Sequence, residues 1–184
     1  IASRCAVFIQ RSFNNRLSAS LPDAALYDSF VAQRAAITAE FEGRNFQAAM
    51  RLIMALADEA NRYIDESKPW QLIKQEGKLG AVQGICTLGI NLFRVLMTYL
   101  APVLPFTAER SGTFLGQSLN DWNAIDLPLL DCEIASFTPL LTRIDPLKVD
   151  AIIEDSREAM KAIEPEGSAN RKAIEPLAEE IGID

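Results

Sequence analysis

The residues best suited to chemistry lie in residues 61–70, a stretch that ends in Pro69 and Trp70. Pro69 disfavours the α conformation at the residue before it, so a helix leading into it must end near Ser67. Trp70 then lies just past that helix end, on a new short segment. A large aromatic face held at a rigid corner can stack on an unpaired nucleic-acid base. The alternative is a tryptophan that fills the core between two helices, and residue type alone favours this alternative.

Asp65 is the second residue of interest, because it falls in the last turn of the expected helix. A carboxylate there opposes the helix macrodipole by a few tenths to ~1 kcal/mol, so it is disfavoured unless it has a distant partner. That partner could be a cationic side chain or the exocyclic amine of a base. The simpler interpretation is a solvated charge or a partner for Arg62. Asp65 and Glu66 do not make a catalytic pair, since adjacent helical residues do not face each other.

The chain lacks the usual means of catalysis. It contains no histidine, which removes the commonest general base, metal ligand and triad partner. Cys5, Cys86 and Cys132 are far apart and have no metal or redox spacing, which is typical of reduced thiols in a cytoplasmic protein. There is no phosphate-binding loop, metal-ligand cluster or nucleophile–base set. We therefore expect no catalytic residue, metal or cofactor in this chain.

Composition and charge set limits on the fold and its partners. The 184 residues, 49% of them apolar, allow one domain with a substantial core and an appended tail. The formal net charge of -7 argues against a nucleic-acid binder that ignores sequence. The acidity is concentrated in residues 145–184, which hold eleven acids against five bases, whereas residues 1–16 hold three arginines and no acid. A basic face near the N-terminus is therefore compatible with the overall charge.

Apolar residues recur at helical spacing along most of the chain, with no strand pattern and no internal repeat. Gly43 is the expected stop of the second helix and Asn45 the cap of the third. Residues 117–139 show no period and should form an ordered loop on the bundle. The prediction is an all-α helix bundle. The expected helices are residues 1–16, 23–42, 46–67, 81–100, 106–115 and 147–163, with a short helical turn at 70–75 and a weak helical segment at 169–181.

Residues 85–104 are apolar on nearly all sides, but Asn91, Arg94 and Pro102 interrupt them. A buried core helix is therefore favoured over a membrane span. Arg94 is expected to form a structural ion pair or to cap backbone groups. Asp145, as an N-cap with Pro146 after it, should start the last long helix. We expect residues 1–163 to form a helical domain and residues 164–184 an acidic linker or tail.

Residues 61–70, followed by residues 75–77, resemble the anticodon-binding domain of the methionyl-tRNA synthetase family, in its bacterial form. The similarity runs from residue 1 to about residue 160, with the motifs in the same order and at matching spacing. It implies a helix bundle of the class I aminoacyl-tRNA synthetase anticodon-binding type, in a fragment of a longer protein. The other motifs that carry the resemblance are residues 2–4 with Phe8 and Ile9, residues 89–100 with Pro102 and Pro105 after them, and residues 141–145.

The resemblance implies that the domain recognises the CAU anticodon. In this family the tryptophan matching Trp70 stacks with the first anticodon base, and the arginine matching Arg4 helps to read base edges. An asparagine that assists this arginine would fall just before Ile1. Pro69 and Asp65 match positions beside the anticodon pocket. Because stacking tolerates any base, Trp70 should supply affinity, whereas the planar five-donor fork of Arg4 suits base identity.

Two departures from the family pattern, Gln10 and Ser12, leave the role of Arg11 open. The parent enzyme joins methionine to its tRNA with ATP and magnesium, and zinc is a further candidate, in a catalytic domain before this fragment. The catalytic signatures are missing here, so the fragment should be inactive alone. The segment from Leu141 onward is similar to the piece that folds back toward the catalytic domain.

The partners implied are initiator and elongator methionine tRNA and the catalytic domain of the same polypeptide, in the cytoplasm, with no membrane and no DNA. One rival interpretation is the anticodon domain of another class I synthetase. Another is a helical protein-interaction scaffold, which predicts a buried Trp70 and no basic surface near Arg4. An autonomous enzyme is a distant third.

Overall fold

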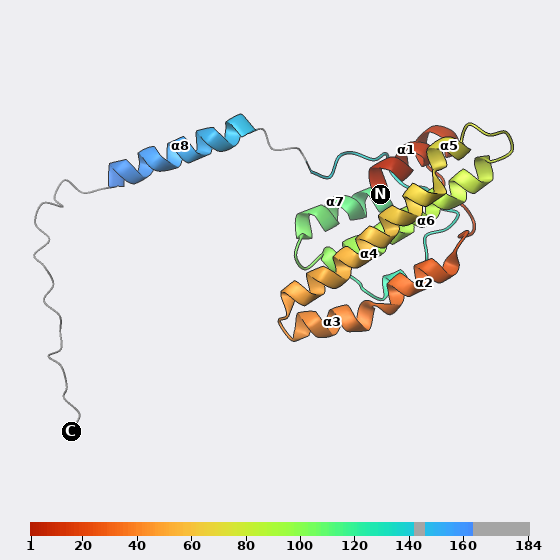
Figure 1. The fold of residues 1–184 in the computed structure, drawn as a ribbon, viewed down its shortest axis with the longest axis horizontal. Helices are drawn as coiled ribbons and strands as arrows, with labels where there is room; N and C mark the ends of the chain where they lie inside the picture. The colour runs from red at the N-terminus through yellow and green to blue at the C-terminus, as the bar shows by residue number, and fades with distance from the viewer. Residues whose placement is uncertain (142–145, 164–184) are drawn as a thin grey trace, which may run out of the picture. The chain divides into compact units, whose positions relative to one another are not determined.

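The computed structural model describes residues 1–141 and 146–163. All regular structure within these residues is helical, which confirms the all-α prediction (Figure 1). The elements are α1 (Ala2–Phe13), α2 (Ala24–Ala32), α3 (Arg34–Glu42), α4 (Phe46–Ser67), α5 (Pro69–Leu72), α6 (Leu79–Leu100), α7 (Pro105–Leu115), the 3-10 turn η1 (Ala124–Asp126) and α8 (Pro146–Ile163).

The chain divides after Leu141 into two compact units, residues 1–141 and 142–184. The second unit contains α8, which carries exposed apolar side chains at Val149, Ile152 and Ile153. The proposed domain boundary at residue 163 coincides with the end of α8 and stays a prediction. The expected cap at Asp145, the tail 164–184 and the weak helical segment 169–181 lie outside the described residues. All the candidate site residues belong to the first unit.

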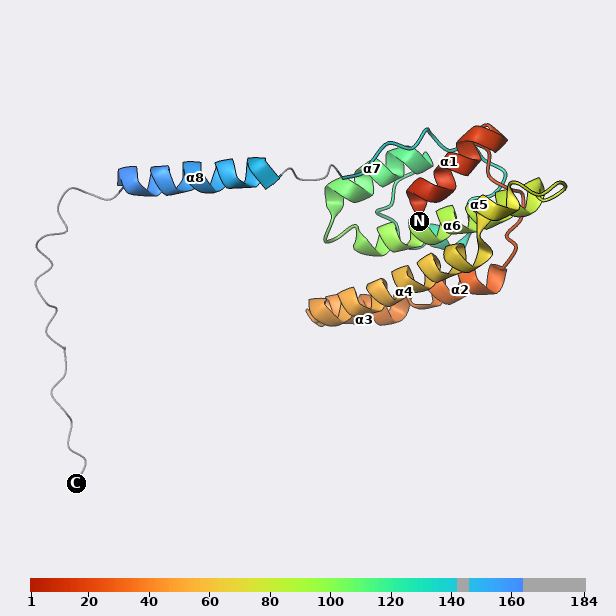
Figure 2. The same ribbon diagram turned by 45° about the horizontal axis from the view of Figure 1, so that its top comes forward.

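Helix α6 is the central element of the first unit, because nearly every residue from Val82 to Tyr99 is buried. One apolar cluster joins α6 to α1 and α7, and a second joins it to α2, α3 and α4. Figure 2 shows α1 and α7 on one side of α6, with α4, α2 and α3 on the other. The length and hydropathy of α6 would suit a membrane span, but 72% of its apolar window is buried within the protein. It is a core helix, as the sequence predicts.

Polar side chains on α6 hold the long loop that follows α7. The Asn91 amide donates to the Leu129 carbonyl at 2.9 Å and accepts from the Leu129 N–H at 2.6 Å. The Arg94 guanidinium donates to the carbonyls of Ala124 and Leu127. No carboxylate pairs with Arg94 among the described residues, so its role is the backbone-capping one. These bonds replace the regular backbone pairing that the loop lacks, and they give it the ordered path that the sequence predicts.

One expected helix is wrong: residues 23–42 form two helices, α2 and α3, which meet at Gln33. The apolar period continues through this point, so the break is invisible in the sequence. Its cause is tertiary. The Tyr99 hydroxyl, which comes from α6, donates to the carbonyls of Phe30 at 2.9 Å and Val31 at 3.2 Å. A side chain inserted into the helical hydrogen-bond ladder bends or breaks a helix.

Smaller differences concern helix ends. α3 stops at Glu42 as expected, but Gly43 keeps a right-handed conformation and Arg44 adopts the left-handed one, with φ of 60°. Asn45 occupies the cap position of α4 without making a side-chain capping bond. α6 begins at Leu79, two residues before the expected start at residue 81, so Gly80 lies inside the helix. None of these differences moves the candidate site.

Candidate nucleic-acid interface

The corner between α4 and α5 forms as the sequence predicts. α4 ends at Ser67, and Lys68 leaves the right-handed helical region with φ of 45° and ψ of 56°. Pro69 occupies the first position of α5, where a missing N–H leaves no hydrogen bond unmade. The Lys68 carbonyl accepts from the N–H groups of Gln71 at 2.8 Å and Leu72 at 3.2 Å. The direction of Trp70 is therefore fixed by two helices separated by a single residue.

Trp70 is half-buried, whereas Pro69 before it is fully buried. The indole packs against the apolar cluster of α1 and α6 and keeps part of its surface in solvent. It pairs with no other aromatic ring in the described part of the chain. Trp122 differs, because its ring lies 5.0 Å from that of Tyr99 and 6.1 Å from that of Phe41. Both tryptophans are half-buried, and Trp122 also lines a cavity with Arg34 and Phe41, so exposure alone does not single out Trp70.

Arg4 and Asp65 form an ion pair across two helices. Nη1 of Arg4, on α1, lies 2.6 Å from Oδ1 of Asp65, in the last turn of α4. The partner of this carboxylate is thus Arg4, a cationic side chain distant in sequence, rather than Arg62. About half of each side chain is exposed, at 49% and 56%, so the pair contributes only ~0–1 kcal/mol to stability. Its main effect is to hold the guanidinium at the last turn of α4, the turn that precedes the Trp70 corner.

The spacing of α1 and α4 is set by Gly89 of α6. A Cβ atom at this position would lie 2.7 Å from Cys5 Sγ and 2.9 Å from Ile64 Cδ1. Cys5 follows Arg4 and Ile64 precedes Asp65, so the ion pair is anchored by two side chains that meet over one glycine. Sequence reasoning did not assign this role to Gly89. A glycine inside an otherwise apolar helix is the signal that could have revealed it.

Two buried groups next to the site have shifted pKa values. Burial raises the pKa of Tyr63, on α4, to about 12, although a hydrogen bond with Ser67 acts in the opposite direction. A hydrogen bond with the Cys5 thiol, followed by burial, raises the pKa of the Cys86 thiol. Both groups are therefore neutral near pH 7. They contribute packing rather than charge, so the charge of the site comes from exposed side chains such as Arg4 and Asp65.

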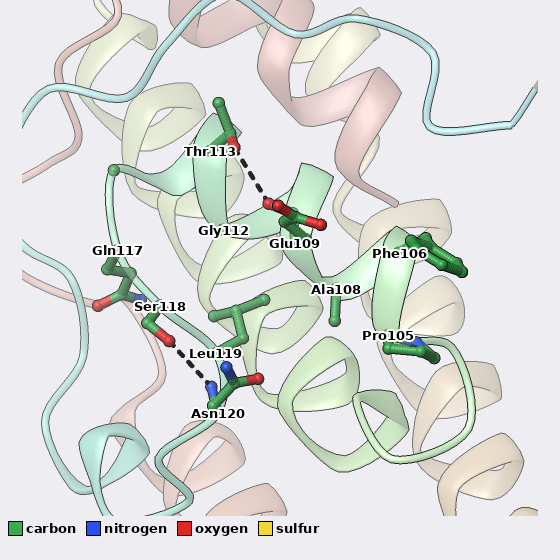
Figure 3. Close-up of a pocket in the computed structure, with 11 residues that line it drawn as sticks. Pro105, Phe106, Ala108, Glu109, Gly112, Thr113, Gln117, Ser118, Leu119 and Asn120 are labelled. Atoms are coloured by element: carbon green, nitrogen blue, oxygen red, sulfur yellow. Dashed lines mark hydrogen bonds between the residues drawn. The ribbon is translucent and has the colours of Figure 1, made fainter.

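A separate cavity of about 580 Å³ lies along α7 and the segment after it (Figure 3). Its lining includes one carboxylate, Glu109, and the exposed ring of Phe106, but none of the four candidate residues. No group of metal-binding side chains occurs in residues 1–141 or in the described part of α8. Of the four candidate residues, the structure joins Arg4 to Asp65 in an ion pair and places Pro69, which is buried, and Trp70 at the start of α5.

The whole chain can be compared with known proteins. Residues 18–132 match the family described as the anticodon binding domain of methionyl tRNA ligase. This chain belongs to that family. The match includes Asp65, Pro69 and Trp70 and begins after Arg4. It confirms the resemblance that the sequence motifs carry, and it sets aside both the other class I synthetases and the unrelated scaffold.

Curated relatives agree. The chain is 48% identical over 179 residues to a methionine–tRNA ligase of Stenotrophomonas maltophilia strain R551-3. The match covers 97% of this chain and 26% of the relative. It is 53% identical over 154 residues to the methionine–tRNA ligase of strain K279a, covering 84% of this chain and 22% of the relative. The chain therefore spans about a quarter of the length of these relatives.

Solved structures support the fold. The apo form of Mycobacterium tuberculosis methionyl-tRNA synthetase superposes with a TM-score of 0.72 at 21% identity, over 79% of this chain and 31% of that one. The same enzyme bound by methionyl-adenylate gives 0.71 at 20% identity, over 77% and 30%. At this level of identity the likeness shows the helical architecture alone.

Proposed function

We propose that this domain binds methionine tRNA, initiator and elongator, through the CAU anticodon. It would act as the anticodon-binding part of methionine–tRNA ligase, which attaches methionine to its tRNA with ATP. The observation that carries the proposal is the half-buried Trp70 at a rigid corner, which directly follows the helix turn where Asp65 orients the guanidinium of Arg4. Membership of the anticodon-binding family supports a tRNA as the partner.

Each of the four residues has a distinct task in this proposal. Trp70 stacks on the first anticodon base, and one such stack contributes ~1–3 kcal/mol. Arg4 donates to base edges with the N–H groups that Asp65 does not engage, because directional bonds discriminate where stacking does not. Asp65 positions Arg4. Pro69 is buried, so it acts by fixing the corner rather than by touching RNA.

The chemistry of aminoacylation belongs elsewhere on the polypeptide in this proposal. A catalytic domain on the same chain would hold ATP and magnesium, with zinc as a further candidate, and this domain would supply no catalytic residue and bind no cofactor. A cytoplasmic location agrees with the three cysteines, all of which are free thiols. No role for DNA or a membrane is proposed.

The test is the binding of this chain, at low salt, to methionine tRNA and to the same tRNA with an altered first anticodon base. We expect a preference for CAU that collapses in Trp70→Ala, with a loss of ~1–3 kcal/mol in binding free energy. Phe106→Ala is the matched control, because it removes an exposed aromatic ring from α7. Equal binding of both RNAs, unchanged by Trp70→Ala, would reduce Trp70 to a packing residue and contradict the proposal.

A further inference from the structure

The exposed face of α1 carries more than Arg4. Arg4, Phe8 and Arg11 are spaced at i, i+4 and i+7, so they share one face of the helix, and α1 contains no acid. The opposite face is buried through Ala2, Cys5, Ala6 and Ile9. Arg11 lies ~10 Å along the helix axis from Arg4, because the rise is ~1.5 Å per residue. The face therefore presents two guanidinium groups separated by a half-buried aromatic ring.

Arg11 differs from the other two arginines of this segment. Arg4 is paired with Asp65, and Arg16 lies 2.9 Å from a carboxylate oxygen of Asp131. Among the ion pairs of the described residues, none contains Arg11. It is exposed in the last turn of α1. Its charge is therefore not neutralised by a carboxylate in this unit.

The position of Arg11 relative to Trp70 follows from the packing of α1 on α6. The Cys5 side chain of α1 packs against Gly89, in the middle of α6. Past the end of α1, the Arg16 carbonyl accepts from the Gln83 amide, near the start of α6, at 3.0 Å. Moving along α1 from Arg4 toward its C-terminal end therefore leads toward the start of α6, which α5 also contacts. In Figures 1 and 2 the C-terminal end of α1 and α5 lie toward the same end of the first unit.

The chain around α5 adds further positive charge. Lys68, Lys74 and Lys78 flank or follow this helix, and Glu76 is the only acid between the first and the last of them. The local excess of cations contrasts with the net charge of -7 for the whole sequence. An RNA strand that reaches Trp70 would thus meet an excess of cations after the corner, along residues 68–78, in addition to the arginines of α1.

We propose that Arg11 binds a backbone phosphate of the anticodon loop, beside the bases that Trp70 and Arg4 engage. The inference rests on the proposed function. A guanidinium holds a phosphate with two parallel N–H···O bonds, which suits an exposed arginine without a carboxylate partner. Such a contact carries no base information, so it contributes affinity and salt dependence while Arg4 contributes identity.

The test is the salt dependence of tRNA binding by the Arg11→Gln variant of this chain. We expect the slope of log K against log salt to become shallower by ~0.7–0.9, the value for one phosphate contact. Affinity should fall by the same factor for methionine tRNA and for the tRNA with an altered anticodon base. Arg11→Lys, which keeps the charge, should restore most of the slope.

Arg51→Gln is the matched control, because Arg51 is an exposed arginine near the other end of α4. It lies ~21 Å along that helix from Asp65, beyond the Debye length of ~10 Å at 0.1 M salt, and should leave the slope unchanged.

If Arg11→Gln matches this control while the CAU preference persists, the inference fails and the proposed function stands. A changed preference for CAU in Arg11→Gln would make Arg11 a base reader and also overturn it. If the unmodified chain shows no CAU preference, the proposed function itself fails. Arg11 could instead only complement the α1 macrodipole, in which case thermal stability would change and the salt slope would not.

Discussion

At the residue scale, the proposed function gives the Arg4–Asp65 pair two effects on RNA binding that can be separated. The carboxylate orients the guanidinium, and it also places a negative charge where an RNA strand would approach. Orientation favours the correct base, whereas the charge disfavours every RNA to a similar extent. In the proposed function, the pair would therefore lower affinity and raise selectivity.

Asp65→Asn should separate these effects, because it removes the charge and keeps the size of the side chain. We expect tighter binding of both the CAU tRNA and the altered tRNA, with a smaller ratio between the two affinities. The free energy of unfolding should change by no more than ~1 kcal/mol, because the pair is half-exposed. Binding and denaturation measurements on the same preparation check both points. An unchanged ratio would show that Arg4 needs no orientation by Asp65.

A second prediction at this scale concerns pH. Burial raises the pKa of Tyr27 to about 12, and the Tyr27 hydroxyl donates to the Ile125 carbonyl at 2.6 Å. The folded state therefore binds the phenol proton more tightly than the unfolded chain, in which the pKa is about 10. This contribution to stability is complete below pH ~10 and is lost as pH rises from there toward 12. Tyr63 acts in the same direction.

Urea unfolding at a series of pH values, with phenolate absorbance followed in parallel, measures this loss. Tyr27→Phe is the control: it should be less stable at neutral pH, because the bond to Ile125 is missing, but should lose less stability at alkaline pH. Equal alkaline loss in both proteins would mean that Tyr27 titrates normally.

At the element scale, the contact of α1 and α4 over Gly89 links stability to the site. Gly89→Ala would force the new Cβ against Cys5 Sγ and Ile64 Cδ1. Overpacking of this kind costs ~1–3 kcal/mol, and it should also weaken anticodon binding by separating Arg4 from Asp65. Thermal denaturation and tRNA binding check the two effects.

The control for this prediction is Gly80→Ala, in the first turn of the same helix, where an added Cβ meets nothing within 4 Å. That change should stabilise the protein by ~0.5–1 kcal/mol through helix propensity and leave binding unchanged. If Gly89 were only a packing position, Gly89→Ala would lose stability but would bind tRNA as well as Gly80→Ala at a temperature where both are folded. Full binding by Gly89→Ala would show that the spacing of the two helices does not matter to the site.

The helix ends and breaks show which features of the fold could be predicted from the sequence and which could not. Pro69 acts on its immediate neighbours, so the end of α4 and the corner at Trp70 were predictable from local rules. The break at Gln33 was not, because it depends on the Tyr99 hydroxyl, which is distant in the chain. For Asp65, the sequence showed that a distant partner was needed. Only the packing of α1 beside α4 identified it as Arg4, which lies 61 residues away.

At the scale of the whole molecule, charge is distributed so that an acidic chain can still meet RNA. The net charge is -7, yet the acids outnumber the bases mainly after residue 145, in the second unit. Six of the twelve cations in residues 1–141 lie in or beside α1 and α5, where the candidate site is proposed. Overall composition, taken alone, pointed away from nucleic acid. The motifs pointed toward it, because recognition depends on a local surface rather than on the sum of charges.

The single glycine beneath the ion pair also has a consequence for motion. Arg4 and Asp65 are each adjacent to a side chain fully buried on α6, so their helices cannot separate unless the core opens. Amide hydrogens in the middle of α1 and in the last turns of α4 should therefore exchange with solvent only through global unfolding. A surface of this kind is already ordered before its ligand arrives. Binding would then cost little conformational entropy, and the flexible partner in the encounter would be the RNA loop.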